Sequence, residues 1–306
     1  MKILWHQENM PHMNVRKNKG VTYLTWPEFE KIPGFVHGFS TRLGGVSEGI
    51  YSSMNLSFTR GDKEEAVREN YNRISAALGF SPEDIVTSDQ THTANVRVIT
   101  AEDRGNGITK PRPYTDVDGM ITNVPGLVLA TFYADCVPLY FADPVHKAVG
   151  LSHSGWRGTA AGIGAVTVKE LQKHYGTRPE DIYAAVGPSI CQDCYEVSED
   201  VILEFQKTFS RELWKDIFYR KENGKYQLNL WEANPSDPAW GRDSSGTYFH
   251  AESLYLLQSG VPLFSQGLSG KKRKSGSVSG NKAVRQGVIR RTLFCSVFTD
   301  AVLNDK

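Results

Sequence analysis

Residues 148–176 read AVGLSHSGWRGTAAGIGAVTVKELQKHYG, and this stretch passes from one kind of secondary structure to another within a few residues. Its first part, Ala148–Ser152, is an apolar run typical of a buried strand. Its second part, Gly158–Tyr175, predicts a helix that ends at Gly176, and the small residues of this helix allow it to lie close against a sheet. A strand followed at once by such a helix indicates a mixed α/β fold.

Similar β-branched or apolar runs flank this stretch, and turn residues separate them. The runs that precede it are expected to be strands of a single sheet and span residues 85–87, 96–99, 119–122, 127–132 and 138–141. After it, the sequence predicts a strand at 182–186, a helix from 198 to about 209 and a strand at 226–230.

A further helix is predicted between Asp62 and Gly79. Asp62 and Glu65 have the spacing of an N-cap with its capping-box partner, and Gly79 stands where a C-cap is expected. Apolar residues recur between them at helical spacing, at Val67, Tyr71, Ile74 and Leu78.

The length of 306 residues allows two domains, but α/β domains of about 250 residues are common, and we expect one compact domain. We place it at residues 21–234. Residues 1–20 are polar and have no apolar period, so they are expected to form a flexible leader. Residues 235–306 combine Ser-Gly-rich stretches with a basic cluster at 271–274, and they are expected to be a poorly ordered tail.

The charge balance excludes some partners. Lysine and arginine number 35 and aspartate and glutamate 34, so the chain has no overall field that would attract nucleic acid or an anionic membrane. No apolar run approaches the length of a membrane span, and we expect a cytoplasmic protein. With 4 cysteines there is no disulfide scaffold, so each thiol either fills the core or takes part in chemistry. Nothing in the sequence fixes an oligomeric state.

Three potential metal ligands lie in turn-rich places: His92, Cys136 and His153. Neutral imidazole and thiolate are natural ligands of zinc, and two histidines with one cysteine leave a fourth position open, as catalytic zinc sites do. Pro138 makes the backbone around Cys136 irregular. The alternative for each residue is an ordinary buried histidine or an inert cysteine.

Two places could bind an anion. His153 is followed by glycines just before a helix, and Arg157 in that turn could bind phosphate, although an ordinary surface arginine is an equal alternative. The loop from Ser40 to Ser47 combines hydroxyl groups, Arg42 and paired glycines that permit close backbone approach, which suits a phosphate or a ribose. A plain structural loop is the alternative there.

Cys191 and Cys194 form a C-x-x-C pair. A four-cysteine zinc site needs a second pair, which the chain lacks, and no thioredoxin-like aromatic context precedes this one. Structural zinc and a redox dithiol are therefore both disfavoured on sequence grounds.

Six strings in this order resemble one family: His37-Gly-Phe-Ser-Thr-Arg-Leu-Gly-Gly-Val-Ser, Asp89-Gln-Thr-His, Asp118-Gly-Met, Tyr133-Ala-Asp-Cys-Val-Pro, His153-Ser-Gly-Trp-Arg-Gly-Thr and Gly187-Pro-Ser-Ile. It is the laccase-domain family, also called polyphenol oxidase-like. Its members are reported as purine nucleoside phosphorylases with adenosine deaminase activity. The resemblance runs from about Val21 to Asn234.

The resemblance implies a single three-layer, mixed-sheet α/β domain of the kind shared with a deamidating bacterial toxin. It implies that His92, Cys136 and His153 bind zinc and line the active site. It also implies phosphorolysis of adenosine, inosine, guanosine and methylthioadenosine, with deamination of adenosine. Copper is disfavoured as the cofactor, because copper oxidases need many histidines, usually in His-x-His pairs, and none of the 8 histidines here is so placed.

The tail departs from the family's pattern after Glu232-Ala233-Asn234. Reading degenerate codons one nucleotide later from Pro235 permits a family-like continuation, Arg-Gln-Ile-Leu-Leu-Gly-Ala-Gly-Ile-Pro. We therefore interpret residues 235–306 as an aberrant and frame-shifted segment.

For catalysis, the sequence favours Arg42, and next Arg157, as the phosphate ligand, with Ser40 beside them. Asp135 or a histidine is expected to carry the proton to the departing purine. Two alternatives stay open: a metal-free hydrolase in which the Cys136 thiolate attacks with His153 as base, and a non-catalytic protein that binds a partner.

Overall fold

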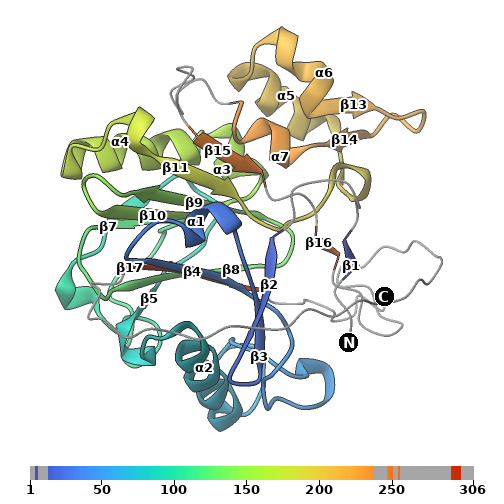
Figure 1. Ribbon diagram of the computed structural model, residues 1–306. Coiled ribbons are helices and arrows are strands. Elements are labelled where there is room, and N and C mark those ends of the chain that lie inside the picture. The colour runs from blue at the N-terminus through green and yellow to red at the C-terminus, as the bar shows by residue number, and fades with distance from the viewer. Residues whose placement is uncertain (1–3, 6–12, 237–246, 251–253, 256–290, 298–306) are drawn as a thin grey trace.

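The computed structural model describes residues 4–5, 13–236, 247–250, 254–255 and 291–297 (Figure 1). They form two large mixed sheets, a smaller three-stranded sheet and a short two-stranded pairing of β1 (Leu4–Trp5) with β16 (Leu254–Tyr255). Among the residues described, none of the helices combines the length and the apolar character needed to cross a membrane.

The first large sheet has the strand order β15-β11-β9-β10-β7-β6. Its strands span Thr247–His250 (β15), Tyr183–Val186 (β11), Val137–Asp143 (β9), Ala148–Ser154 (β10), Gly119–Thr122 (β7) and Val96–Val98 (β6). The second large sheet has the order β2-β3-β4-β17-β8-β5. Its strands span Asn14–Asn18 (β2), Val21–Thr25 (β3), Phe35–Ser40 (β4), Arg291–Val297 (β17), Val128–Tyr133 (β8) and Ile85–Thr87 (β5).

The mixed α/β class is confirmed, but the expectation of one sheet is wrong. The runs at 85–87 and 127–132 became β5 and β8 of the second sheet, whereas those at 96–99, 119–122 and 138–141 became β6, β7 and β9 of the first. The reason is that an apolar run shows that a strand is buried and does not show which neighbour it pairs with.

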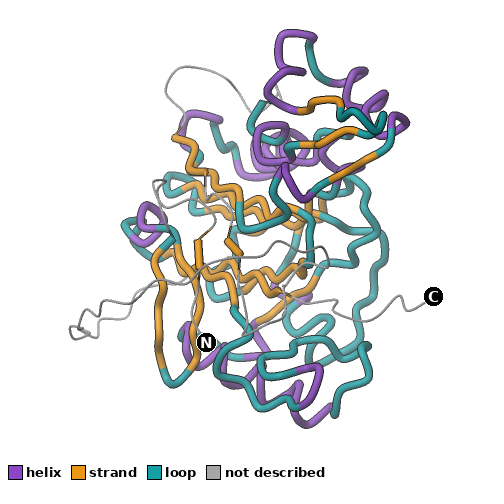
Figure 2. Tube along the Cα trace, turned by 90° about the vertical axis from the view of Figure 1, so that its right-hand side faces the viewer, coloured by secondary structure: helices purple, strands orange, loops and turns teal. Residues whose placement is uncertain are grey.

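The two large sheets pack face to face and share a hydrophobic core. Leu24, Phe39 and Leu129 of the second sheet lie in one buried cluster with Tyr140 and Val149 of the first. Strands of both sheets occupy the middle of the molecule in Figure 2, with helices above and below. The family resemblance implied three layers with a single domain, and the structure contains two large sheets between its helices.

Helices cover the outer faces of the two sheets. Helix α4 (Ile163–Tyr175) packs Ile163, Val168 and Leu171 against the first sheet, and α2 (Glu64–Leu78) packs its apolar face against β5 and β8 of the second. The remaining elements are α1 (Pro27–Glu30), α3 (Trp156–Ala160), α5 (Glu199–Thr208), α6 (Trp214–Ile217), α7 (Leu230–Ala233), β12 (Glu196–Val197), β13 (Phe218–Arg220) and β14 (Tyr226–Leu228).

The predicted helix at 62–79 is confirmed, but its cap is different. Gly79 adopts the left-handed conformation (φ 87°) that ends the helix. Asp62 does not cap the helix: its carboxylate accepts hydrogen bonds from the side chains of Ser47 and Asn55, and Lys63 occupies the N-cap position. The carboxylate therefore bonds loop side chains that are distant in sequence and does not cap the helix that follows it.

The predicted helix at 158–175 is two helices, α3 and α4, that meet at Gly162. This glycine has φ 69°, a conformation that L residues rarely adopt, so the chain turns there before α4 begins. Gly176 closes α4 as predicted.

The expected boundaries need correction where the structure describes the terminal segments. Asn14–Asn18, placed in the flexible leader, form β2, which pairs with β3 along its full length. Within the tail at 235–306, residues 247–250, 254–255 and 291–297 are strands, and β17 lies between β4 and β8 in the second sheet. The rest of the tail, with the basic cluster at 271–274, lies outside the described residues. The frame-shift interpretation stays a prediction.

A buried histidine lies in the core between the sheets. His37 of β4 is 4% exposed, and its Nε2 accepts a hydrogen bond from the backbone N–H of Trp26 at 2.7 Å. The rings of Trp26 and Phe29 enclose it. Burial disfavours the charged ring and lowers the pKa of His37 from 6.5 to about 4, although the Glu30 carboxylate opposes this shift.

We expect this histidine to make the fold acid-sensitive. Above pH 6.5 the ring is neutral in both states, and as the pH falls toward 4 only the unfolded chain gains the proton, so stability is lost over that window. Because the pKa of His37 is about 2.5 lower in the folded chain than in the unfolded chain, the free energy of unfolding falls by up to roughly 3 kcal/mol. Urea denaturation from pH 7.5 to 4.5 measures it, and His37→Gln, which keeps an acceptor for Trp26, should flatten the dependence. Equal pH slopes in the two proteins would show that His37 is not the cause.

Candidate metal centre

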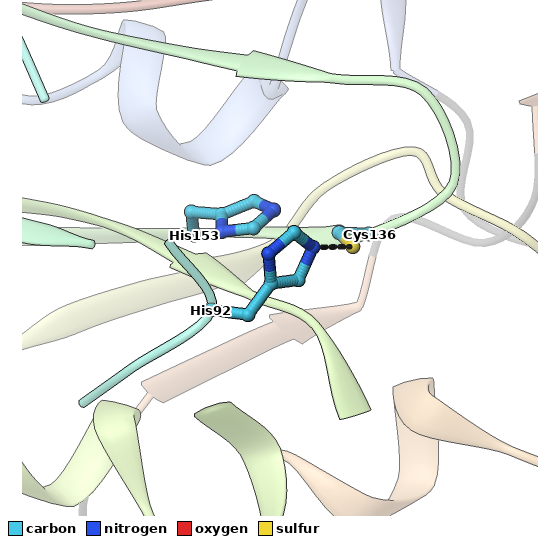
Figure 3. Close-up of side chains that lie close together, drawn as sticks. All are labelled: His92, Cys136 and His153. Carbon is cyan, nitrogen blue, oxygen red and sulfur yellow. Dashed lines mark hydrogen bonds between the residues drawn. The ribbon is translucent and has the colours of Figure 1, made fainter. Parts of the chain in front are cut away.

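The structure brings His92, Cys136 and His153 together (Figure 3). One ligand atom from each lies within 4.8 Å of the others, and Cys136 Sγ is 3.8 Å from His92 Nε2. His153 is buried, Cys136 is half-buried and His92 is exposed, so the cluster opens on one side to the surface. Within the part of the chain that the structure describes, this is the one group of three or more histidine, cysteine or acidic residues with metal-site spacing.

The register of the first sheet explains the meeting of two of these residues. In the antiparallel ladder of β9 and β10, His153 is opposite Pro138 and Ser154 is opposite Val137. Cys136 directly precedes Val137, so the start of β9 brings the thiol beside the end of β10 that carries His153. The proline at the start of β9 is compatible with this, because its missing N–H falls at the end of the ladder.

Asp118 holds the two histidines in place. It directly precedes β7, its carboxylate is fully buried, and its backbone C=O accepts a hydrogen bond from the N–H of His153 at 2.7 Å. The carboxylate accepts a second one from His153 Nδ1 at 2.7 Å. An ionised carboxylate can only accept, so Nδ1 carries the proton and Nε2 keeps its lone pair for a metal.

The same carboxylate organises the loop of His92. It accepts hydrogen bonds from the backbone N–H groups of Thr91 (3.1 Å), His92 (3.1 Å) and Thr93 (2.8 Å), and from Thr93 Oγ1 (2.9 Å). His92 has φ 67°, a left-handed conformation that lets successive N–H groups point at one anion. The loop therefore folds around Asp118 and presents the His92 ring toward Cys136.

Burial, hydrogen bonds and nearby charges shift three pKa values in and beside the cluster. Burial opposes the ionisation of Asp118, but the hydrogen bonds from His153 and Thr93 outweigh it and lower the pKa to about 2. Burial, and then the nearby His153, lower the pKa of His92 below its usual value. Burial, with the Asp135 and Asp118 charges, raises the pKa of Cys136 to about 12. A neutral His92 and the anionic Asp118 favour a bound cation, whereas the Cys136 thiol must lose its proton to bind one.

Gly155 leaves room for the cluster. A Cβ at this position would lie 2.8 Å from His92 Cδ2, closer than real Cβ atoms approach, and 3.0 Å from Cys136 Sγ, which is a tight contact. The donor set and this space fit a metal ion: His92, Cys136 and His153 would be its protein ligands, and the nitrogen and sulfur donors suit zinc or copper.

The other predicted site residues differ in their surroundings. Asp135 lies in the turn between β8 and β9 and is exposed. Arg157 is exposed, and its guanidinium carbon is 4.2 Å from the centroid of the Trp156 ring. Among the described residues, this guanidinium makes no hydrogen bond or ion pair. Its charge lowers the pKa of His92, which places it near the cluster.

Arg42 and Ser40 lie in or beside β4. Arg42 donates from Nε to the carbonyl oxygen of Ser52 at 2.9 Å and from Nη2 to that of Ile50 at 3.0 Å, so its guanidinium holds the neighbouring loop. Ser40 is buried at the carboxyl end of β4. Because β4, β17 and β8 are parallel, this end lies at the same edge of the second sheet as the turn that carries Cys136.

The sequence analysis missed the roles of Asp118, Thr93 and Gly155. Asp118 was noticed only within the string Asp118-Gly-Met. The signal that could have found it is an acidic residue directly before a buried strand, since metal-binding histidines usually donate their second N–H to a carboxylate.

Known proteins are similar to this chain in sequence and in fold. The family model described as "Multi-copper polyphenol oxidoreductase laccase" matches residues 36–237. The chain is 38% identical over 205 residues to purine nucleoside phosphorylase YlmD of Geobacillus stearothermophilus, covering 66% of this chain and 73% of that protein. It is 35% identical over 210 residues to adenosine deaminase RL5 of an unknown prokaryotic organism, covering 68% and 79%. The crystal structure of YlmD from G. stearothermophilus superposes with a TM-score of 0.70 and 34% identity, over 82% of this chain and 89% of that chain.

We predict that Asp118→Asn weakens metal binding. The amide cannot reproduce the charge that orients His153 Nδ1, and loss of such a partner lowers metal affinity about 10- to 100-fold. Titration of the protein with zinc against a chelating indicator measures this. Asp116→Asn is the matched control, because Asp116 contacts Thr91 and Asn95 and does not contact His153. Equal affinities for the two variants would contradict the role of Asp118.

We also predict opposite effects for two alanine substitutions. Gly155→Ala pushes a methyl group into His92 and Cys136, so zinc affinity falls while stability changes little. Gly150→Ala puts its methyl 3.0 Å from Thr167 Cγ2 in the core, so it costs about 1–3 kcal/mol of stability and leaves zinc affinity unchanged. Zinc titration and urea denaturation of both variants test the pair. Retained affinity in Gly155→Ala would mean that the cluster does not need this space.

Proposed function

The chain belongs to the multi-copper polyphenol oxidoreductase laccase family, and we propose that it is a zinc-dependent purine nucleoside phosphorylase with adenosine deaminase activity. Its substrates would be adenosine, inosine, guanosine and methylthioadenosine, with phosphate as the second substrate. The convergence of His92, Cys136 and His153 beside an exposed arginine carries the proposal. The names of the relatives support the two activities.

Zinc fits the residues better than the copper of the family's name. Copper oxidases need several histidine-rich sites, whereas the described residues hold one group of two histidines and one cysteine. Other histidines have partners elsewhere: His37 accepts from Trp26, His146 contacts Asp143, and His174 contacts Glu170.

We assign Arg157 to phosphate. Its guanidinium is exposed and makes no hydrogen bond or ion pair among the described residues, and Trp156 supports it from one side. Arg42 is the weaker choice, because its Nε and Nη2 are already bonded to backbone carbonyls. A guanidinium presents paired N–H groups that match the oxygens of phosphate.

We assign Asp135 to proton transfer. Its charge raises the pKa of Cys136 and of Tyr195, so the carboxylate lies near the cluster. In phosphorolysis, a phosphate oxygen bonds to C1′ of the ribose while the bond from C1′ to the purine breaks. Asp135 would accept the proton of dihydrogen phosphate and pass it to the departing purine, which leaves the base and ribose 1-phosphate.

In deamination, water adds at C6 of the purine and ammonia leaves. A bound zinc ion would supply a Lewis acid that activates this water. Asp135 would take a proton from the water and give it to the amino group. Asp118 would hold the ring of His153 and the backbone of His92 in place during both reactions.

The proposal is tested by incubating the purified chain with adenosine, with and without phosphate, and separating adenine, inosine and ribose 1-phosphate. We expect adenine and ribose 1-phosphate only with phosphate present, and inosine in both cases. Chelation should abolish both reactions and added zinc restore them. Activity that persists without metal and is lost on alkylation of Cys136 would favour the cysteine hydrolase instead.

Arg157→Ala separates the two reactions. Loss of a charge-assisted hydrogen bond costs about 1.5–3 kcal/mol, so we expect the KM for phosphate to rise about 10- to 100-fold while the rate of inosine formation stays unchanged. Arg157→Lys should recover part of the phosphate affinity. Equal losses in phosphorolysis and deamination would show that Arg157 does not bind phosphate.

A further inference from the structure

The C-x-x-C pair, which the sequence alone disfavoured as a redox site, is a pair in contact. The 3-10 turn η5 (Gln192–Cys194) folds the chain back, and the N–H of Cys194 donates to the carbonyl of Cys191 at 3.1 Å. The two sulfur atoms are 3.2 Å apart. This separation is about 1 Å longer than a disulfide bond of ~2.05 Å, a gap that closes when the two residues move toward each other.

The two thiols differ in access. Cys191 is 4% exposed, whereas Cys194 is half-buried and reaches the surface. One accessible and one covered thiol in contact is the arrangement in which the outer sulfur reacts with an oxidant and the inner sulfur resolves the product.

The pair is connected to the turn that carries Cys136. The segment 187–190 runs beside 135–138: the N–H of Gly187 donates to the carbonyl of Pro138 at 2.7 Å, and that of Ile190 donates to the carbonyl of Asp135 at 2.9 Å. Ile190 directly precedes Cys191, and Asp135 directly precedes Cys136. A movement of Cys191 is therefore passed on through one hydrogen bond to the residue next to a metal ligand.

The described residues do not supply the further donors that a metal site at the pair would need. Across the described residues, no third histidine, cysteine or carboxylate joins Cys191 and Cys194 in a group with metal-site spacing. Two thiolates alone do not complete the four ligands of structural zinc.

We propose that Cys191 and Cys194 form a reversible disulfide, and that its formation loosens the contact between Ile190 and Asp135 beside the metal centre. This inference goes beyond the proposed function and does not rest on it, because both parts concern the chain itself.

The oxidant is a disulfide of the glutathione type. The Cys194 thiolate attacks one sulfur of oxidised glutathione, which breaks that S–S bond and releases one glutathione thiolate. Cys191, as its thiolate, then attacks Cys194 Sγ and releases the second glutathione. The protein loses two electrons and two protons, and one oxidised glutathione becomes two reduced molecules. Reduced glutathione or a dithiol reverses both steps.

The first test uses the full-length chain in oxidised glutathione, followed by alkylation and peptide mass spectrometry. We expect most of the wild-type protein to carry a Cys191–Cys194 link that a dithiol removes. Cys191→Ser should stop at a glutathione adduct on Cys194, whereas Cys194→Ser should leave Cys191 unmodified. Cys295→Ser is the control and should form the link as the wild type does. Alkylation of both Cys191 and Cys194 in the oxidised wild type, or a lasting adduct on Cys194 in it, would overturn the disulfide.

The second test measures amide hydrogen exchange of the peptide that contains Ile190 in the oxidised and reduced chain. We expect a loss of protection at Ile190 on oxidation and none in Cys194→Ser under the same conditions. Because this readout involves no substrate and no metal, it is independent of the enzymatic assays. A disulfide that forms without any change in protection would overturn the proposed link to Asp135.

Discussion

The candidate metal centre depends on one buried carboxylate. Asp118 takes no part in the ligand set, yet it receives the N–H groups of Thr91, His92 and Thr93 together with His153 Nδ1. An ionised carboxylate without partners in the interior costs many kcal/mol, so these donors are what allow it to stay charged there. In turn, the carboxylate stabilises the left-handed backbone of His92, which most residues avoid. Removing this charge would release the loop and the ring at the same time.

The two-sheet architecture explains why the site lies where it does. The chain passes from the second sheet to the first twice in this region: from β5 to β6 through the loop of His92, and from β8 to β9 through the turn of Cys136. Both crossings leave carboxyl ends of parallel strands, so they leave the same edge of the second sheet. His153 reaches this edge from the end of β10 in the first sheet. The candidate ligands therefore lie in loops and at a strand end, where the backbone is irregular. The strand pairs on either side hold these segments in position.

The sequence was sufficient to predict helices and strands from local patterns of apolar residues. It was insufficient to predict which strands pair with each other. Periodicity predicted the helix of Val67 and Tyr71. The turn-rich settings of His92 and Cys136 marked them as candidate ligands, and the structure places the two side chains together. The division of strands between two sheets was missed, because burial on both faces gives the same apolar run in either sheet. The break at Gly162 was missed because glycine is also tolerated within helices, and only its positive φ shows the turn.

Charged residues were the hardest to assign from sequence. Arg42 and Arg157 both stand in glycine-containing stretches of the sequence. The guanidinium of Arg42 is bonded to two carbonyl groups, whereas that of Arg157, on α3, makes no hydrogen bond or ion pair among the described residues. Which arginine is available to an anion depends on acceptors brought in by folding, and no spacing rule contains that information. The same holds for Asp62, which has the pattern of a cap and instead bonds Ser47 and Asn55.

The last residue of the family-like stretch is part of the support of the centre. The side chain of Asn234 accepts a hydrogen bond from Ser154 Oγ at 2.8 Å and donates one to Thr159 Oγ1 at 3.3 Å. Both hydrogen bonds are buried. Ser154 follows His153, and Thr159 lies on α3, the helix that begins after Gly155. Asn234 therefore ties α7 to the strand end and the helix that flank the ligand. Because these bonds are made by Asn234 itself, this support is complete before Pro235, whatever reading frame encodes the residues that follow.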